Sequence, residues 1–399
     1  MKQVLSFSNR DLLYEDRKLS EVALINPSST VPSEFEYVDL ESVSGTEMIR
    51  HRLERKETAP SRAQRLAKRG DIFYQTVRPY QKNNYFFDMD EDNYVFSTGY
   101  AQIRPQINGK YLFTLLQSDA FLGQVLDYCA GTSFPAINPS ILSNLLIRVC
   151  TNQREQELIA NFFVYYDNII STASSRLASL KQVKEASLQA MFPQKGETVP
   201  KIRFKGFEGE WEEVKLKDIS TKVIEKNRLN NISITLTNSA EYGIINQRDF
   251  FDHDVSNTDN VSGYFIVQPN DFVYNPRIST LAPVGPINMN KLGYAGVVSP
   301  LYYVFRVTGF NKSFLDIYFH TNVWHKFMKD NGNTGARFDR LSISNELFYE
   351  MPIYCPRDEN EQQQIASYFT SLDKQITLQT QQLEKLKQIK AACLDKMFV

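Results

Sequence analysis

The residue types that most often carry catalysis or metal binding are sparse in this chain of 399 residues. Its histidines and cysteines are few and scattered: His51, His253, His320 and His325, with Cys129, Cys150, Cys355 and Cys393. His320 and His325 are five residues apart, which takes them off the shared helix face that an i, i+4 zinc pair needs. Because no CxxC pair occurs either, the sequence predicts neither a metal site nor a disulfide framework.

The sequence also lacks nucleotide-binding and complete methyl-transfer motifs. No GxxxxGK[ST] or GxGxxG motif occurs, so a phosphate-binding loop has no support. The run Tyr274-Asn275-Pro276-Arg277 is similar to the Asn-Pro-Pro-aromatic loop with which amino-methyltransferases hold their target nitrogen. Arg277 stands where the second proline belongs, and no glycine-rich cofactor loop precedes it. We therefore expect no catalytic residues and no cofactor-binding or metal site in this chain.

Basic, amide and aromatic residues do gather in two places, and this mixture suits contacts with DNA phosphates and base edges. Arginine can hold guanine and asparagine or glutamine can hold adenine in the major groove, whereas Lys82 suits a phosphate. A solvated polar surface is the alternative for any single position. The predicted DNA-binding residues are Gln75, Arg78, Tyr80, Lys82, Asn83 and Tyr85 in the first half, and Asn275, Arg277 and Arg337 in the second.

Composition places the chain among ordinary globular proteins, with 42% hydrophobic and 23% charged residues. Its length favours two or three domains. Lys and Arg total 45 against 46 Asp and Glu, a net charge of -1, which argues against wholesale coating of a polyanion but leaves local patches open. Neither a signal peptide nor an 18-residue apolar run is present, so we expect a cytoplasmic protein without a membrane partner.

An internal repeat organises the whole chain. Residues 155–192 and 361–398 share 16 of 38 aligned positions at an offset of 206. Weaker matches continue upstream: GDIFY (70–74) answers NDFVY (270–274), and YEDRKLSEV (14–22) answers WEEVKLKDI (211–219). The chain is thus one unit of about 200 residues written twice. Each unit is a variable globular part, with short β-like runs between turns, followed by a strongly repeated segment.

The repeated segments are predicted to be long amphipathic helices. Asn152 and Asp358 are good caps, with Glu155 and Glu361 three residues later. Because neither helix can bury its apolar stripe alone, we expect the two to pack against each other as a coiled coil. Parallel packing would crowd both globular parts at one end, so we expect the antiparallel direction, which gives a pseudo-twofold axis. In the alternative, each helix packs only on its own globular part. The predicted helix-packing residues are Ile170, Leu177, Leu180, Met191, Ile376, Leu383, Leu386 and Met397.

Several of these stretches resemble one known family along essentially the whole chain. EQxxIAxxF recurs at 155–163 and 361–369, LxxLKQxK recurs at 177–184 and 383–390, and both helices end in Met-Phe. KIRFKGFEGEWEEVKLKDI (201–219), APSRA with KRGDIFYQTVRPYQKNNY (within 59–85) and STGYA (97–101) add to the pattern. The chain resembles the specificity subunit of type I restriction-modification enzymes. It departs from the pattern at its opening, where Tyr14 stands in place of the tryptophan found at 211.

The resemblance implies an α+β protein with two tandem α/β target-recognition domains, each followed by a conserved spacer helix. The boundaries are 1–150 for the first target-recognition domain, 151–195 for the first spacer helix, 196–356 for the second domain and 357–399 for the second helix. Each domain would read one half of a bipartite target in double-stranded DNA. The helices would set the spacing and dock two methyltransferase (modification) subunits, and two restriction/translocase subunits could join them.

The same resemblance assigns S-adenosylmethionine, ATP and Mg to the partner subunits and makes this chain non-catalytic. Two other functions stay open. A coiled-coil scaffold with protein-binding globular ends would explain the helices but not the arginine, amide and aromatic loops. A self-sufficient DNA methyltransferase would require the cofactor loop that the sequence lacks. The DNA sequence that would be read does not follow from the residues.

Overall fold

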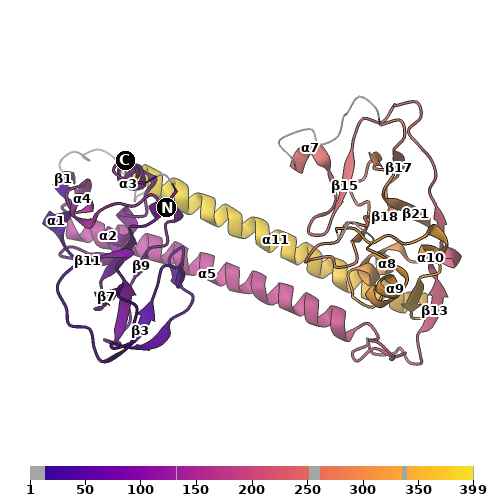
Figure 1. Ribbon diagram of the computed structural model, residues 1–399, viewed down its shortest axis with the longest axis horizontal. Coiled ribbons are helices and arrows are strands. Elements are labelled where there is room, and N and C mark those ends of the chain that lie inside the picture. Colours follow the sequence, from indigo (N-terminus) through magenta and orange to yellow (C-terminus); the bar gives the residue numbers. More distant parts are fainter. Residues whose placement is uncertain (1–13, 132, 251–260, 335–338, 399) are drawn as a thin grey trace. The chain divides into compact units, whose positions relative to one another are not determined.

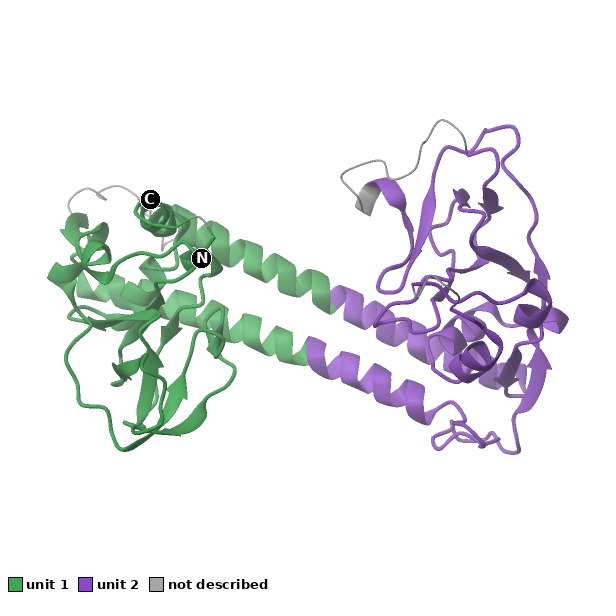
Figure 2. Cartoon of the chain, in the orientation of Figure 1, with its two compact units in different colours: residues 1–176, 379–399 green, residues 177–378 purple. Residues whose placement is uncertain are grey.

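The computed structural model describes residues 14–131, 133–250, 261–334 and 339–398 (Figure 1). The chain forms two compact units, which Figure 2 distinguishes by colour. Unit 1 contains residues 1–176 and 379–399, and unit 2 contains residues 177–378. The boundaries fall within the two long helices, α5 (Gln153–Ala190) and α11 (Glu359–Met397), so each unit includes a part of both.

The described part of unit 1 contains two four-stranded sheets and two two-stranded ribbons. In the first ribbon, β1 (Tyr14–Lys18) pairs antiparallel with β12 (Leu146–Cys150). One four-stranded sheet, here called the inner sheet, has the order β2 (Ala23–Ile25), β11 (Tyr100–Pro105), β8 (Ile72–Gln75) and β9 (Tyr85–Phe86). The outer sheet has the order β6 (Arg52–Arg55), β3 (Glu34–Val38), β10 (Tyr94–Ser97) and β7 (Ala63–Leu66), and β4 (Val43–Ser44) pairs with β5 (Glu47–Met48). Its short helices are α1 (Leu19–Val22), α2 (Gly109–Leu115), α3 (Asp119–Asp127) and α4 (Pro139–Leu142).

Unit 2 repeats the ribbon and the inner sheet. The ribbon pairs β13 (Glu212–Lys215) with β22 (Pro352–Cys355), and the sheet has the order β14 (Ser220–Lys222), β21 (Tyr303–Val307), β18 (Phe272–Tyr274) and β19 (Ile287–Met289). Two ribbons stand in place of an outer sheet: β15 (Leu236–Ser239) with β16 (Gly243–Asn246), and β17 (Phe265–Val267) with β20 (Gly296–Val298). The short helices are α6 (Leu216–Ile219), α7 (Gln247–Phe250), α8 (Lys312–Phe319), α9 (His325–Asn331) and α10 (Asn345–Tyr349).

A buried ion pair marks the same point in both inner sheets. In unit 1, Arg104 donates from Nε and Nη2 to the Asp71 carboxylate at 2.7 and 2.8 Å. In unit 2, Arg306 makes the same two bonds to Asp271, again at 2.7 and 2.8 Å. Both aspartates are almost fully buried, and a buried carboxylate needs such a bidentate partner. The common strand order and this common pair confirm the predicted duplication.

Both long helices form where the sequence predicts them. The side chain of Asn152 accepts a hydrogen bond from the backbone N–H of Glu155 at 3.1 Å, so Asn152 caps α5 as expected. Asp358 accepts from the N–H of Asn360 at 2.8 Å in the same role before α11. After α5, Phe192 is followed by Pro193, which cannot continue a helix.

Within each unit the two helices run antiparallel and are joined by the same ion pair. In unit 1 Lys390 on α11 pairs with Asp167 on α5, and in unit 2 Lys184 on α5 pairs with Asp373 on α11 at 2.5 Å. Asp167 and Asp373 are 206 residues apart, as are Lys184 and Lys390, so repeat-related residues make both bonds. The predicted antiparallel packing is confirmed. The symmetry of these contacts is that of a head-to-tail duplication.

The predicted helix-packing residues differ in burial along the two helices. Leu177, Met191 and Leu383 are buried, and Ile170, Leu180, Ile376, Leu386 and Met397 are partly buried. Both helices also contribute to the unit cores, because Phe163 belongs to the core of unit 1 and Phe369 to that of unit 2. Packing between the helices and packing on a globular part therefore occur together, so the two predicted arrangements do not exclude each other.

Candidate nucleic-acid interface

The loop after β8 in unit 1 holds Arg78 in a conformation that few side chains adopt. Arg78 and Lys82 both have positive φ angles, 55° and 52°, and Pro79 follows Arg78 directly. A non-glycine residue in this region costs on the order of 1 kcal/mol and persists where the surroundings fix it. Here the N–H of Arg78 donates to Pro135 at 2.7 Å, and its guanidinium lies 4.4 Å from the ring centroid of Phe134. The backbone of Arg78 is thus fixed by a hydrogen bond, and its guanidinium stacks on the ring of Phe134.

Gln75, predicted to contact bases, is engaged inside this loop. Its side-chain amide donates to Gln81 at 2.9 Å and accepts from the N–H of Asn83 at 3.2 Å, while its backbone N–H donates to Asn84 at 2.7 Å. Asn83 in turn accepts from the N–H of Gly45 at 2.8 Å. The buried Gln75 therefore fixes the shape of the loop in this conformation, and its base contact stays a prediction.

The other predicted residues of this loop are exposed to different degrees. The Lys82 ammonium group donates to the carboxylate of Asp119 and to the carbonyl of Gln117, so its charge is already paired. Tyr85 is half-buried and stacks on Phe96 at 5.9 Å, and burial raises the pKa of its hydroxyl. Tyr80 is half-exposed. Arg78 and Tyr80 are accordingly the members of the set that are best placed to meet a nucleic acid.

A cavity of about 480 Å³ opens beside Arg78. It is lined by Leu40, Glu41, Val43, Ser44, Ile49, Gln75, Val77, Arg78, Gln81, Asn83 and Phe134. Its one acidic group, Glu41, is paired with Arg50 at 2.6 Å. Guanidinium, amide and ring groups thus face a shared space of ligand size, and these groups suit base edges and phosphates.

In unit 2 the corresponding loop carries Asn275 and Arg277. Asn275 is buried, and its side chain donates to the carbonyl of Asn238 at 2.9 Å and accepts from the N–H of Arg277 at 3.0 Å. The Arg277 side chain is exposed, and its backbone forms an antiparallel bridge with Arg340. Arg337 lies outside the described residues. Asn275 therefore shapes the loop in this conformation, and Arg277 is left to face outward.

We expect Gly285→Ala to disturb this loop and to lower the free energy of unfolding by about 2–3 kcal/mol. Gly285 has a φ of 82°, and a Cβ there would lie 2.2 Å from the carbonyl oxygen of Asn275. Gly293→Ala is the matched control, because its φ is 77° but no atom lies within 4 Å of an added Cβ. Urea unfolding should give a clearly larger loss for Gly285→Ala, and equal losses would contradict the close contact.

The part of the chain that the structure describes contains neither a candidate metal site nor a candidate membrane-spanning helix. No group of three or more His, Cys, Asp or Glu side chains in that part of the chain is arranged to hold a metal ion. Among the helices described there, none combines the length and apolarity that crossing a membrane requires.

Part of this chain is similar to a known domain family. Residues 208–388 match the family model of the type I restriction modification DNA specificity domain. Unit 1 carries the same ribbon, inner sheet and buried ion pair, so it is a second copy of the same fold.

Individual proteins are also similar to this chain. The type I restriction enzyme HindI specificity subunit of Haemophilus influenzae is 29% identical over 139 residues, which are 33% of this chain and 30% of that protein. The alignment therefore spans less than a third of the relative. The S subunit of a type I restriction-modification system from M. genitalium has the same fold over 100% of this chain and 98% of its own, with a TM-score of 0.59 and 11% identity. A chain from a structure on complex assembly and conformational transition of the type I R-M system covers 97% of both chains, with a TM-score of 0.58 and 21% identity.

Proposed function

We propose that this chain is the DNA sequence-specificity subunit of a type I restriction-modification enzyme. The observation that carries the proposal is the duplicated fold itself. The ribbon, inner sheet and helix pair are the same in both units, whereas the outer strands differ. A subunit that reads two different half-sites while presenting equivalent surfaces to two identical partners requires this combination.

In this proposal each unit reads one half of a bipartite target in double-stranded DNA, and α5 and α11 set the spacing between the halves. The chain itself is non-catalytic. Two methyltransferase subunits dock on the helix pair and hold S-adenosylmethionine, and restriction/translocase subunits, where they join, use ATP and Mg. Arginine, lysine, amide and tyrosine side chains of the loops supply the contacts with phosphates and base edges.

Deleting this gene should abolish methylation of a split DNA motif in the host genome. Genome-wide mapping of methylated bases, with and without the gene, would show the motif disappear and would supply its two halves and their spacing. The deletion strain complemented with the intact gene is the control, and the motif should return. An unchanged methylation pattern would contradict the proposal and would favour a scaffold that binds only proteins.

A further inference from the structure

A short β-bridge occupies the same place in the two units. It joins Val77 to Ala136 in unit 1 and Arg277 to Arg340 in unit 2. Val77 and Arg277 are 200 positions apart, and their bridge partners, Ala136 and Arg340, are 204 positions apart. Small insertions between the repeats account for the difference. In unit 1 this bridge lies beside the stacked Arg78. In unit 2 it brings Arg340 to a different cavity.

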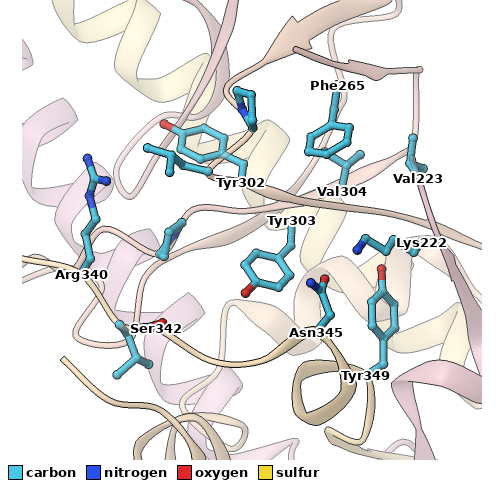
Figure 3. Close-up of a pocket in the computed structure, with 14 residues that line it drawn as sticks. Lys222, Val223, Phe265, Tyr302, Tyr303, Val304, Arg340, Ser342, Asn345 and Tyr349 are labelled. Atoms are coloured by element: carbon cyan, nitrogen blue, oxygen red, sulfur yellow. The ribbon is translucent and has the colours of Figure 1, made fainter. Parts of the chain in front are cut away.

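The cavity in unit 2 measures about 370 Å³ and combines aromatic walls with two cations. Phe265, Tyr302 and Tyr303 supply rings, and Lys222 and Arg340 supply the positive charges. Figure 3 shows Arg340 and Lys222 on opposite sides of the view, with Tyr303 between them. A volume of this size lies within the usual range for ligand sites.

The cations of this cavity have no acidic partner among the residues that the structure describes. Neither Lys222 nor Arg340 forms an ion pair there, whereas nearby Arg306 is bound to Asp271. An unpaired Lys or Arg at a cavity leaves its charge available to a bound anion. The two positive charges of the cavity therefore favour a negatively charged ligand.

One hydroxyl group at the cavity is also without a partner. Tyr303 donates to the carbonyl of Ile343 at 2.5 Å, and Tyr302 shares a hydrogen bond with Thr237 at 3.3 Å. The hydroxyl of Tyr349 is buried and has no hydrogen-bond partner, and Figure 3 shows Tyr349 on the same side of the cavity as Lys222. Burial raises the pKa of this hydroxyl, so it stays protonated and can donate. A buried hydroxyl without a hydrogen-bond partner is destabilising, and a hydrogen bond to a ligand oxygen would remove that cost.

We infer that this cavity contacts the phosphodiester backbone of the DNA strand at the half-site that unit 2 reads, with Lys222, Arg340 and Tyr349 binding phosphate oxygens. The inference rests on the proposed function and extends it to residues outside the predicted set. An ammonium, a guanidinium and a protonated hydroxyl are all donors, and a phosphodiester offers only acceptors. The aromatic walls then pack against sugar or base of the same nucleotide.

The test measures binding of the full-length chain to a duplex of about 40 base pairs that carries the motif found by methylation mapping. Lys222→Ala and Arg340→Ala should each weaken binding by about 5–10-fold near 0.15 M salt. Each should also reduce the slope of log K against log salt by about 0.9, because one phosphate contact is lost. The methylated motif itself should stay unchanged. Arg357→Ala, which removes an exposed charge outside the cavity, is the control and should leave both values unchanged.

Tyr349→Phe separates a ligand contact from a structural role. Since the hydroxyl has no partner in the free protein, its removal should leave the melting temperature unchanged or raise it, and yet weaken DNA binding. A fall in both stability and affinity would make Tyr349 structural and would overturn its assignment.

Other outcomes would overturn the inference itself. These are unchanged affinity in both alanine variants, a change of one base in the motif, and saturation of the cavity by adenosine monophosphate without competition against DNA. Failure of the proposed function would give different results. The wild-type chain would then bind no duplex, and deletion of the gene would remove no methylated motif from the genome.

Discussion

Replacing Arg203 with alanine should lower the free energy of unfolding of unit 2 by about 3–5 kcal/mol, because it leaves a buried carboxylate without its partner. Arg203 donates from Nε and Nη2 to Glu361 at 2.6 and 2.7 Å, and the Glu361 side chain is 0% exposed. A third bond, from Nη1 to the carbonyl of Gly209 at 2.6 Å, ties the segment before β13 to the same group. Urea unfolding followed by far-UV circular dichroism would measure the loss.

Two further variants test the cause of that loss. Adding Glu361→Gln to Arg203→Ala should restore part of the stability, since the charge that must be buried is removed. In unit 1 the repeat-related glutamate, Glu155, is only partly buried and accepts instead from the hydroxyl of Tyr14 at 3.0 Å. Tyr14→Phe should therefore cost only about 1 kcal/mol. A double variant as unstable as Arg203→Ala alone would rule out the buried charge as the cause.

The long helices and the duplication could be predicted because they depend on local signals. A cap, a capping glutamate and an apolar stripe all lie within a few turns, and Asn152 and Glu155 behave as their types indicate. The pairing of the helices follows from the need of each stripe for a partner, and the antiparallel direction follows from the crowding that parallel packing would cause. Strand pairing carries no comparable signal, because β1 pairs with β12 across more than 100 residues, Tyr14 with Cys150. A repeat alignment likewise could not predict the outer strands, because these strands differ between the two units.

The candidate site shows a second limit of sequence reasoning. Residue type indicates what a side chain can bind, but a partner distant in the sequence decides whether it is free. Lys82 suits a phosphate, yet Asp119 pairs with it, and Gln75 suits adenine, yet its amide bonds to Gln81. Lys222 and Arg340 were not predicted, because the sequence does not show that they line a cavity without an acidic partner among the described residues. Arg340 lies beside the predicted residue Arg277 through a β-bridge, and that pairing follows from the fold and not from neighbouring sequence.

Phe163→Ala and Phe369→Ala should each destabilise one unit by about 3–5 kcal/mol, the usual cost of truncating a buried phenylalanine. The two residues are 206 positions apart and are 1% and 0% exposed. Phe163 packs near Phe398 in the core of unit 1, with ring centroids 6.2 Å apart. Phe369 packs near Phe192 in the core of unit 2, also at 6.2 Å. Hydrogen exchange read by mass spectrometry should show lost protection in unit 1 peptides for the first variant and in unit 2 peptides for the second.

Phe162→Ala is the matched control, because Phe162 neighbours Phe163 on α5 but is 37% exposed. It should change protection in neither unit by more than about 1 kcal/mol. If both core variants reduced protection equally throughout the chain, the two cores would unfold as one cooperative body. Loss of protection in one unit only would mean that each unit is stabilised by its own core, because Phe163 and Phe369 belong to different hydrophobic clusters. The repeated helix sequence would then stabilise two distinct cores, in two units whose outer strands differ.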